Sequence, residues 1–111
     1  MTQPIVQISA TDLADWLAGP DPSKPQLLDV RESWETEYCK LPGSITIPMG
    51  QIMDKANTLN TDQPVVCICH HGIRSQQVAL YLKSLGFSSL YNLRGGIHAW
   101  SSTVDPTCPT Y

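Results

Sequence analysis

Short apolar segments alternate with segments of helical periodicity along the chain. The apolar segments predict strands over residues 5–8, 26–30, 44–47, 65–69 and 89–93. The segment 65–69 is continuously apolar and rich in β-branched residues, which is typical of a strand buried on both faces of a parallel sheet. Because strands that alternate with helices need crossover connections, the pattern predicts an α/β domain with helices on both faces of a parallel sheet.

The predicted helices begin and end at recognisable signals. Ser9, followed three residues later by Asp12, is typical of a capping box, and Gly19 is a suitable end for that helix. The longest helix is expected between Ser75 and Gly86. Its buried face should carry the apolar residues that recur at helical spacing, which are Val78, Ala79, Leu82 and Leu85. Shorter helical segments are expected over residues 33–38, 51–56 and 97–101.

Length and charge indicate one ordinary globular domain. The chain has 111 residues, enough for one core, and a net charge of −3, which argues against nucleic-acid binding. No apolar run is long enough to span a membrane, and no basic segment leads into an apolar stretch at the N-terminus, so a cytoplasmic protein is expected. Residues 1–103 are assigned to the domain and 104–111 to a C-terminal tail.

The four cysteines are Cys39, Cys67, Cys69 and Cys108. Their spacing is not the disulfide framework of a small secreted domain. Two of them, Cys67 and Cys69, stand beside a pair of histidines, which could suggest a metal site. The one-residue spacing and the absence of a second Cys/His cluster argue against zinc, so no metal is expected.

The junction between the central strand and the long helix carries the candidate chemistry. Its loop, residues 69–74, begins with Cys69, contains Gly72 and ends with Arg74. Backbone N–H groups of such a loop and of the first helical turn can converge on one point. A thiol held there beside a cation should have a lowered pKa. Cys69 is therefore the candidate nucleophile for an anionic substrate.

Other interpretations of these residues are structural. A cysteine at the end of a buried strand can be a small core residue, and this is the role expected for Cys67. Cys69 alone has the loop, the glycine and the arginine in the right order. Asp29, Arg31 and Glu32, which end another strand, could take part in catalysis or form a salt bridge that orders the following loop. The salt bridge is the favoured interpretation.

Four segments together resemble the rhodanese-like sulfurtransferases. They are residues 27–32, 42–48, 69–75 and 93–100, in the order found in that family. The resemblance implies a three-layer α/β/α fold with a five-stranded parallel sheet, and Cys69 as the residue that carries a persulfide. It also implies an active-site loop that continues through His70, His71, Gly72, Ile73, Arg74 and Ser75.

The function implied by the resemblance is transfer of sulfane sulfur from a donor such as thiosulfate to cyanide, a thiol or a protein acceptor, with no cofactor. Arg74 is expected to hold the loop and the charged end of the donor. His70 and His71 are expected to be rim residues rather than bases, and His98 a surface or packing residue. Some thiosulfate-specific members carry two cations where these loop histidines stand, which argues against a strong preference for thiosulfate.

Two other functions are weighed against sulfur transfer. Phosphatases and arsenate reductases of related fold use the same thiolate and arginine, but the related phosphatases have a loop one residue longer, so six residues favour sulfur. Non-catalytic partner-binding modules of the family typically lack the loop cysteine, and Cys69 argues against them. No nucleic-acid or membrane partner is expected.

Residues 39–41 and residues 104–111 are the subject of two further predictions. The family usually has Gly-His-Ile where this chain has Cys39-Lys40-Leu41, so the local turn is expected to differ. Residues 104–111 resemble the tail of rhodanese domains fused to enzymes that activate ubiquitin-like sulfur carriers. The tail, with Pro106, Pro109 and a final Tyr111, either packs back on the domain or is a disordered end. If the tail docks near the active-site loop, Cys108 could meet the Cys69 persulfide and form a disulfide with Cys69.

Overall fold

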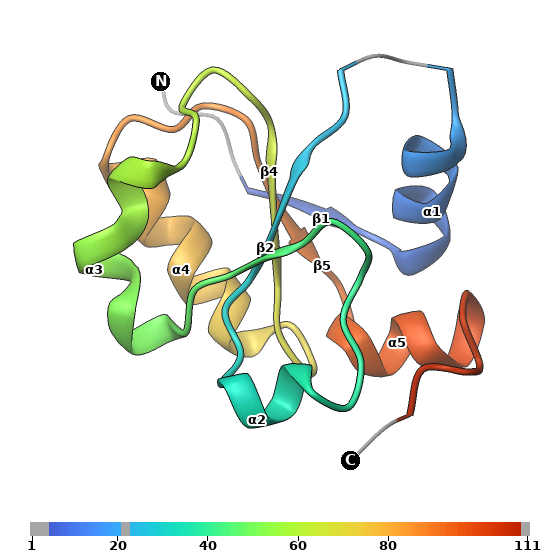
Figure 1. The fold of residues 1–111 in the computed structure, drawn as a ribbon. Coiled ribbons are helices and arrows are strands. Elements are labelled where there is room, and N and C mark those ends of the chain that lie inside the picture. The colour runs from blue at the N-terminus through green and yellow to red at the C-terminus, as the bar shows by residue number, and fades with distance from the viewer. Residues whose placement is uncertain (1–4, 21–22, 110–111) are drawn as a thin grey trace.

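The computed structural model describes residues 5–20 and 23–109 (Figure 1). Its sheet has five parallel strands in the order β1-β5-β4-β2-β3. These are β1 (Val6–Ile8), β2 (Gln26–Asp29), β3 (Ile45–Thr46), β4 (Val65–Ile68) and β5 (Leu90–Leu93). The predicted five-stranded parallel sheet is confirmed.

Helices lie on both faces of this sheet, so the predicted three-layer arrangement is also confirmed. The α3–α4 pair covers one face and the α1–α5 pair the other, while α2 lies beyond the end of β2 (Figure 1). The helices are α1 (Ala10–Ala18), α2 (Ser33–Thr36), α3 (Ile52–Lys55), α4 (Ile73–Ser84) and α5 (Gly96–Thr103), with short 3₁₀ turns η1 (Met49–Gln51) and η2 (Ala56–Thr58) on either side of α3. Ser9 caps α1 as predicted, since its hydroxyl accepts a hydrogen bond from the Asp12 amide at 3.1 Å.

The central strand β4 is buried on both faces. Val65 and Cys67 belong to the core under α3 and α4, and Val66 and Ile68 to the core under α1 and α5. Each of these side chains is 0% exposed. Burying an aliphatic side chain of this size contributes about 1.5–3 kcal/mol, so a polar residue would be unfavourable at any position of the strand. This is why β4 has a continuously apolar sequence.

The long helix differs from the prediction at both ends. It begins at Ile73, two residues before Ser75, because the residue that caps it is Gly72 and not a serine. Val78, Ala79 and Leu82 are buried as predicted, but Leu85 is 48% exposed. The helix ends at Ser84, and Leu85 follows it with φ −89° and ψ 0°, so helical periodicity no longer places its side chain on the core.

The tail packs back on the domain as far as it is described. Cys108 is 3% exposed, joins the core under α1 and α5, and its carbonyl accepts a hydrogen bond from the Ser101 hydroxyl. Cys108 forms a disulfide with Cys39, which lies 69 positions earlier, with 5.4 Å between the Cα atoms. The suggested pairing of Cys108 with Cys69 is therefore wrong, because the tail docks beside residue 39. Thr110 and Tyr111 lie outside the described residues.

None of the helices in the described ranges has the length and apolar character of a membrane-spanning segment.

Candidate active site

The candidate nucleophile lies where β4 ends and the loop to α4 begins. Cys69 is 1% exposed, and the amide of Gly72 donates a hydrogen bond to its Sγ at 3.0 Å. Gly72 has φ +100°, a conformation open to glycine, and with it the chain turns from the loop into α4. A Cβ at this position would also lie 3.3 Å from the carbonyl oxygen of Leu93. The loop therefore needs glycine for its conformation, and a side chain there would also be in tight contact with the Leu93 carbonyl.

A buried serine and asparagine complete the surroundings of the sulfur. The single proton of the Ser75 hydroxyl has two acceptors within reach, Sγ of Cys69 at 3.3 Å and Oδ1 of Asn92. A thiolate is the stronger acceptor, so ionisation of Cys69 draws this proton to the sulfur. The Asn92 amide group donates to the carbonyl of Gly72 at 3.0 Å and to Oε1 of Gln7 at 2.9 Å, which fixes its orientation.

The thiols of Cys67 and Cys69 have pKa values shifted in opposite directions. Burial by itself would raise the pKa of Cys69, but hydrogen bonds lower it below the ordinary value of 9.0. They come from the Ser75 hydroxyl and from the backbone of Ser75, Gly72 and His71. Burial, with a smaller contribution from Cys69, raises the pKa of Cys67 to about 12. Cys67 is thus the expected core residue, and Cys69 is the thiol suited to ionise.

Arg74 connects the loop to α2. Its two terminal nitrogens donate to the two carboxylate oxygens of Glu35, at 2.7 and 2.8 Å. Glu35 is 3% exposed and also accepts the Glu32 amide at 3.0 Å, which closes a capping box at the start of α2. The loop-holding role expected for Arg74 is present. The lowered pKa of Cys69 has hydrogen bonds of Ser75 and the backbone among its causes, and a contribution from the charge of Arg74 stays a prediction.

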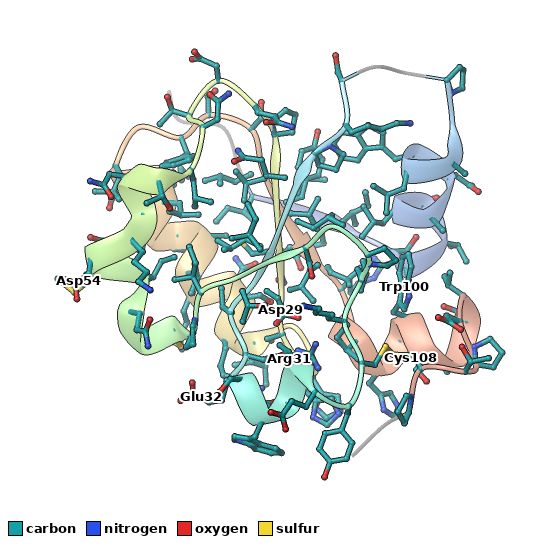
Figure 2. All side chains as sticks on the ribbon, viewed as in Figure 1. Asp29, Arg31, Glu32, Asp54, Trp100 and Cys108 are labelled. Atoms are coloured by element: carbon teal, nitrogen blue, oxygen red, sulfur yellow. A yellow bond between two sulfur atoms is a disulfide. The ribbon has the colours of Figure 1, made fainter. Side chains whose placement is uncertain are left out.

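Asp29 and Arg31 form a fully buried ion pair, each side chain 0% exposed (Figure 2). Nε of Arg31 lies 2.9 Å and Nη2 2.7 Å from the Asp29 oxygens. The same Nη2 donates to the carbonyl of Cys39 at 2.6 Å. The pair therefore organises the connection after β2, which agrees with the salt-bridge interpretation, whereas Glu32 is exposed and precedes α2.

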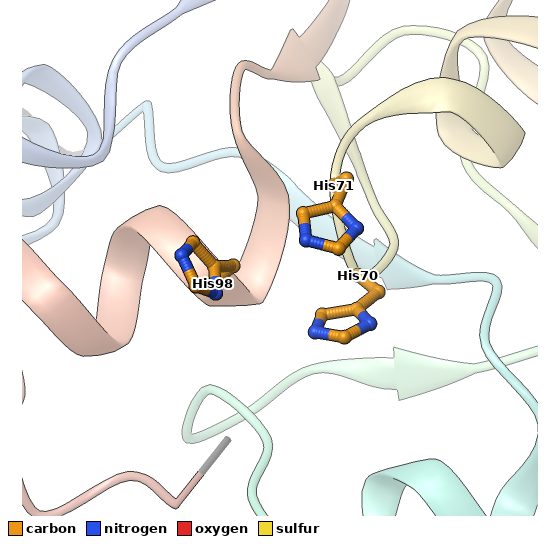
Figure 3. A group of neighbouring side chains, drawn as sticks. All are labelled: His70, His71 and His98. Carbon is orange, nitrogen blue, oxygen red and sulfur yellow. The ribbon is translucent and has the colours of Figure 1, made fainter. Parts of the chain in front are cut away.

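Three imidazoles lie at the rim of the loop (Figure 3). The rings of His70 and His71 are stacked, with centroids 4.1 Å apart. The ring of His98, on α5, lies 5.2 Å from that of His71 and 6.2 Å from that of His70. Partial burial, followed by the charge of His71, lowers the pKa of His70. His98 is exposed, as the sequence suggested, but it faces the active-site loop.

The start of α5 holds the loop backbone in place. The amide of Ile97 donates to the carbonyl of Cys69 at 2.9 Å, and the amide of His98 donates to the carbonyl of His70 at 3.1 Å. A Cβ on Gly96, which has φ +60°, would collide with both of these carbonyl oxygens. The close approach of the two segments therefore depends on glycine at position 96.

The rhodanese-like domain family matches the chain over residues 9–103. The chain belongs to this family. Rhodanese-like/PpiC domain-containing protein 12, chloroplastic, of Arabidopsis thaliana is 40% identical over 114 residues, which cover 98% of this chain and 38% of that protein. Putative sulfurtransferase YtwF of Bacillus subtilis is 40% identical over 80 residues, which cover 72% of this chain and 77% of that protein.

The fold of this rhodanese-like domain is also similar to solved structures. The crystal structure of a rhodanese-like domain protein from Staphylococcus aureus has a TM-score of 0.79 at 33% identity, and the match covers 86% of this chain and 91% of that one. Several curated relatives are longer, since the chain spans 38%, 64% and 43% of the length of three of them.

The rhodanese-like loop brings together most of the residues that the sequence singled out. Ile73 is 72% exposed at the start of α4, so its predicted place in the active-site loop is at the surface. Two buried polar residues were missed, Glu35 and Asn92. An asparagine within an apolar strand segment was a signal that could have drawn attention to Asn92. The only sequence signal for Glu35 was that it follows Glu32 by three residues. That spacing suggests a helix cap and does not predict the contact with Arg74.

Proposed function

We propose that this rhodanese-like domain is a sulfurtransferase of the rhodanese type, in which Cys69 carries sulfane sulfur as a persulfide. One observation carries the proposal: Sγ of Cys69 accepts hydrogen bonds from the Gly72 amide and the Ser75 hydroxyl at the end of β4. These donors favour the thiolate over the thiol, and the thiolate is the form of cysteine that attacks sulfur. The family membership and the name of the Bacillus relative support the same activity.

In the first step the Cys69 thiolate attacks the outer sulfur of a donor such as thiosulfate. A new S–S bond forms, the sulfur–sulfur bond of the donor breaks, and its electron pair leaves with sulfite. The product, Cys69–S–S⁻, keeps the single negative charge that the thiolate had. The donors that stabilise the thiolate are therefore suited to the persulfide as well.

In the second step a nucleophilic acceptor attacks the terminal sulfur of the persulfide. Cyanide gives thiocyanate and a small thiolate gives its persulfide, and in both cases the electron pair of the broken bond returns to Cys69 as a thiolate. The acceptor in the cell is proposed to be a thiol, of a small molecule or of a protein. Neither step needs a metal or an organic cofactor.

Arg74 is proposed to attract the anionic donor while it holds the loop. Its side chain is 35% exposed, so its charge is accessible from solvent although both terminal nitrogens bind Glu35. This engagement also argues against the phosphatase alternative, because a phosphatase needs the arginine fork for the substrate oxyanion. The span of six residues from Cys69 to Arg74, whose last two residues begin α4, also favours sulfur over phosphate.

Intact mass spectrometry tests the proposal directly. Incubation with thiosulfate should add one sulfur atom to the protein, and cyanide should remove it with release of thiocyanate. The Cys69→Ser variant should gain no sulfur, whereas Cys67→Ser should gain it as the wild type does. Absence of the added sulfur from wild-type protein, or faster hydrolysis of an aryl phosphate than sulfur transfer, would contradict the proposal.

A further inference from the structure

All three histidines of the chain gather at one place. The sequence contains His70, His71 and His98, and one ring nitrogen from each lies within 4.8 Å of the other two. Figure 3 shows His70 and His71 side by side on the active-site loop, with His98 opposite them on α5. The cluster therefore joins two elements that are distant in the sequence.

The backbone, and not only the side chains, brings these residues together. A hydrogen bond of 3.1 Å runs from the amide of His98 to the carbonyl of His70, next to the bond between Ile97 and Cys69. Gly96 permits this approach because any Cβ there would collide with the carbonyl oxygens of Cys69 and His70. The spacing of the three imidazoles is thus built into the packing of α5 on the loop.

We propose that His70, His71 and His98 form a binding site for a divalent transition-metal ion of the Zn²⁺ class at the rim of the active-site loop. Zn²⁺ binds imidazole nitrogen at about 2.0–2.1 Å, and three such ligands with one open position are a common arrangement. Nitrogens around a tetrahedral ion lie about 3.3 Å apart at that bond length. The rings of His70 and His71 are now stacked, so their side chains would have to rotate until the ring nitrogens converge on the ion.

The ligand set selects the class of ion. The cluster offers imidazole nitrogens, which suit Zn²⁺, Cu²⁺ and Ni²⁺, and it contains none of the oxygen ligands that Mg²⁺ and Ca²⁺ prefer. His71 and His98 are exposed and His70 is partly exposed, so their rings have room to turn and the ion has access from solvent. The sequence argument against zinc rested on the one-residue spacing of Cys67 and Cys69 and on the absence of a second Cys/His cluster along the chain. Position 98 supplies the missing ligand from another element.

Isothermal titration of the whole chain with ZnCl₂ tests this site. The Cys69→Ser background removes the loop thiolate as a competing ligand and keeps all three imidazoles. One Zn²⁺ should bind per chain, and the same concentration of Mg²⁺ should give no signal. His98→Gln should weaken Zn²⁺ binding by at least about ten-fold, since loss of even a residue behind a metal ligand lowers affinity about 10–100-fold. Asp54→Asn, on α3, is the matched control and should bind as the parent does.

Nuclear magnetic resonance of the imidazole groups gives a second measurement. Zn²⁺ should shift the ring resonances of all three histidines together in the parent protein. Unchanged affinity in His98→Gln, or shifts confined to His70 and His71, would overturn the site. Because His98 is exposed, the variant should keep the circular dichroism spectrum of the parent, which separates loss of a ligand from loss of the fold. The outcome is independent of whether Cys69 transfers sulfur.

Discussion

The guanidinium of Arg74 faces the carboxylate of Glu35, and two parallel hydrogen bonds of 2.7 and 2.8 Å join residues 39 positions apart. The carboxylate is almost completely buried and the guanidinium is 35% exposed. Through this pair the active-site loop and α2 become one unit. The arginine that the loop pattern suggested as an anion anchor is thus also a structural clamp.

The ion pair between Arg74 and Glu35 should make a measurable contribution to the free energy of unfolding. Arg74→Ala should lower the free energy of unfolding by about 1–3 kcal/mol, because it removes two charge-assisted hydrogen bonds from the buried Glu35 carboxylate. Arg74→Lys should lose less, since an ammonium keeps the charge but cannot form two parallel bonds. Urea denaturation of both variants, with Glu35→Gln and the Glu35→Gln/Arg74→Ala double variant, gives the coupling energy of the pair. A coupling energy of zero would contradict the clamp.

The two thiols should respond differently to substitution. Cys69→Ser should abolish thiosulfate:cyanide sulfur transfer, because the alkoxide needed in its place does not form near neutral pH. Cys67→Ser should retain most of the activity, although a hydroxyl in this fully buried position should lower stability. Steady-state rates at matched folded concentration make the comparison. A similar loss of activity in both variants would contradict the assignment of Cys69 as the nucleophile.

Ser75 should control the pH dependence of sulfur loading. Because the pKa of Cys69 is lowered, the thiolate is present above that pKa, and loading should fall as the pH drops through it. Ser75→Ala removes a hydrogen bond to the thiolate and should raise the pKa, so the acidic limb moves to higher pH. A hydrogen bond to a charged group contributes about 1.5–3 kcal/mol, so loading at a pH below the wild-type pKa should slow by at least about ten-fold.

The rate of persulfide formation, followed by mass against pH, is the measurement for Ser75. Ser84→Ala is a suitable control, because its exposed hydroxyl bonds only the nearby carbonyl of Tyr81 among the contacts described. An acidic limb at the same pH in Ser75→Ala and wild type would show that this hydroxyl does not stabilise the thiolate.

Gly96 should tolerate no side chain. Gly96→Ala adds a Cβ that collides with the carbonyls of Cys69 and His70, so it should destabilise the protein by about 1–3 kcal/mol and reduce sulfur transfer. Gly86→Ala is the matched control, because Gly86 also has a positive φ, of 101°, but a methyl group added there would have no atom within 4 Å. Thermal unfolding should show a clearly larger loss at position 96. Equal losses would mean that backbone conformation, and not close approach, explains the glycine.

The tail should contribute to stability through its disulfide. Thiol titration in denaturant should find two free thiols, Cys67 and Cys69, and the other two only after reduction. Cys108→Ser should lower stability by about 2–5 kcal/mol, the usual effect of losing a native disulfide. Truncation after Thr103 should lower the melting temperature further, since it also removes buried tail contacts. Four free thiols in the untreated protein, or unchanged melting of the truncated chain, would contradict this role.

The order of strands and helices, the loop after β4 and the identity of the candidate nucleophile could be predicted from the sequence, because each depends on residues close together in the chain. The apolar segments and helical periodicity that predict the elements lie within short stretches of sequence. The residues of the loop, from Cys69 through Gly72 to Arg74, also follow one another closely. The helix that begins at Ile73 was placed correctly except at its ends, where capping by Gly72 and the exposure of Leu85 depend on backbone conformation rather than periodicity.

The partners of these residues were decided by tertiary structure alone. Asn92 reaches Ser75, Glu35 reaches Arg74 and Cys39 reaches Cys108 across separations of 17, 39 and 69 positions. The meeting of His98 with the loop histidines is of the same kind. No spacing in the chain encodes these contacts, because they arise when crossover connections bring the ends of parallel strands and the starts of their helices to one edge of the sheet.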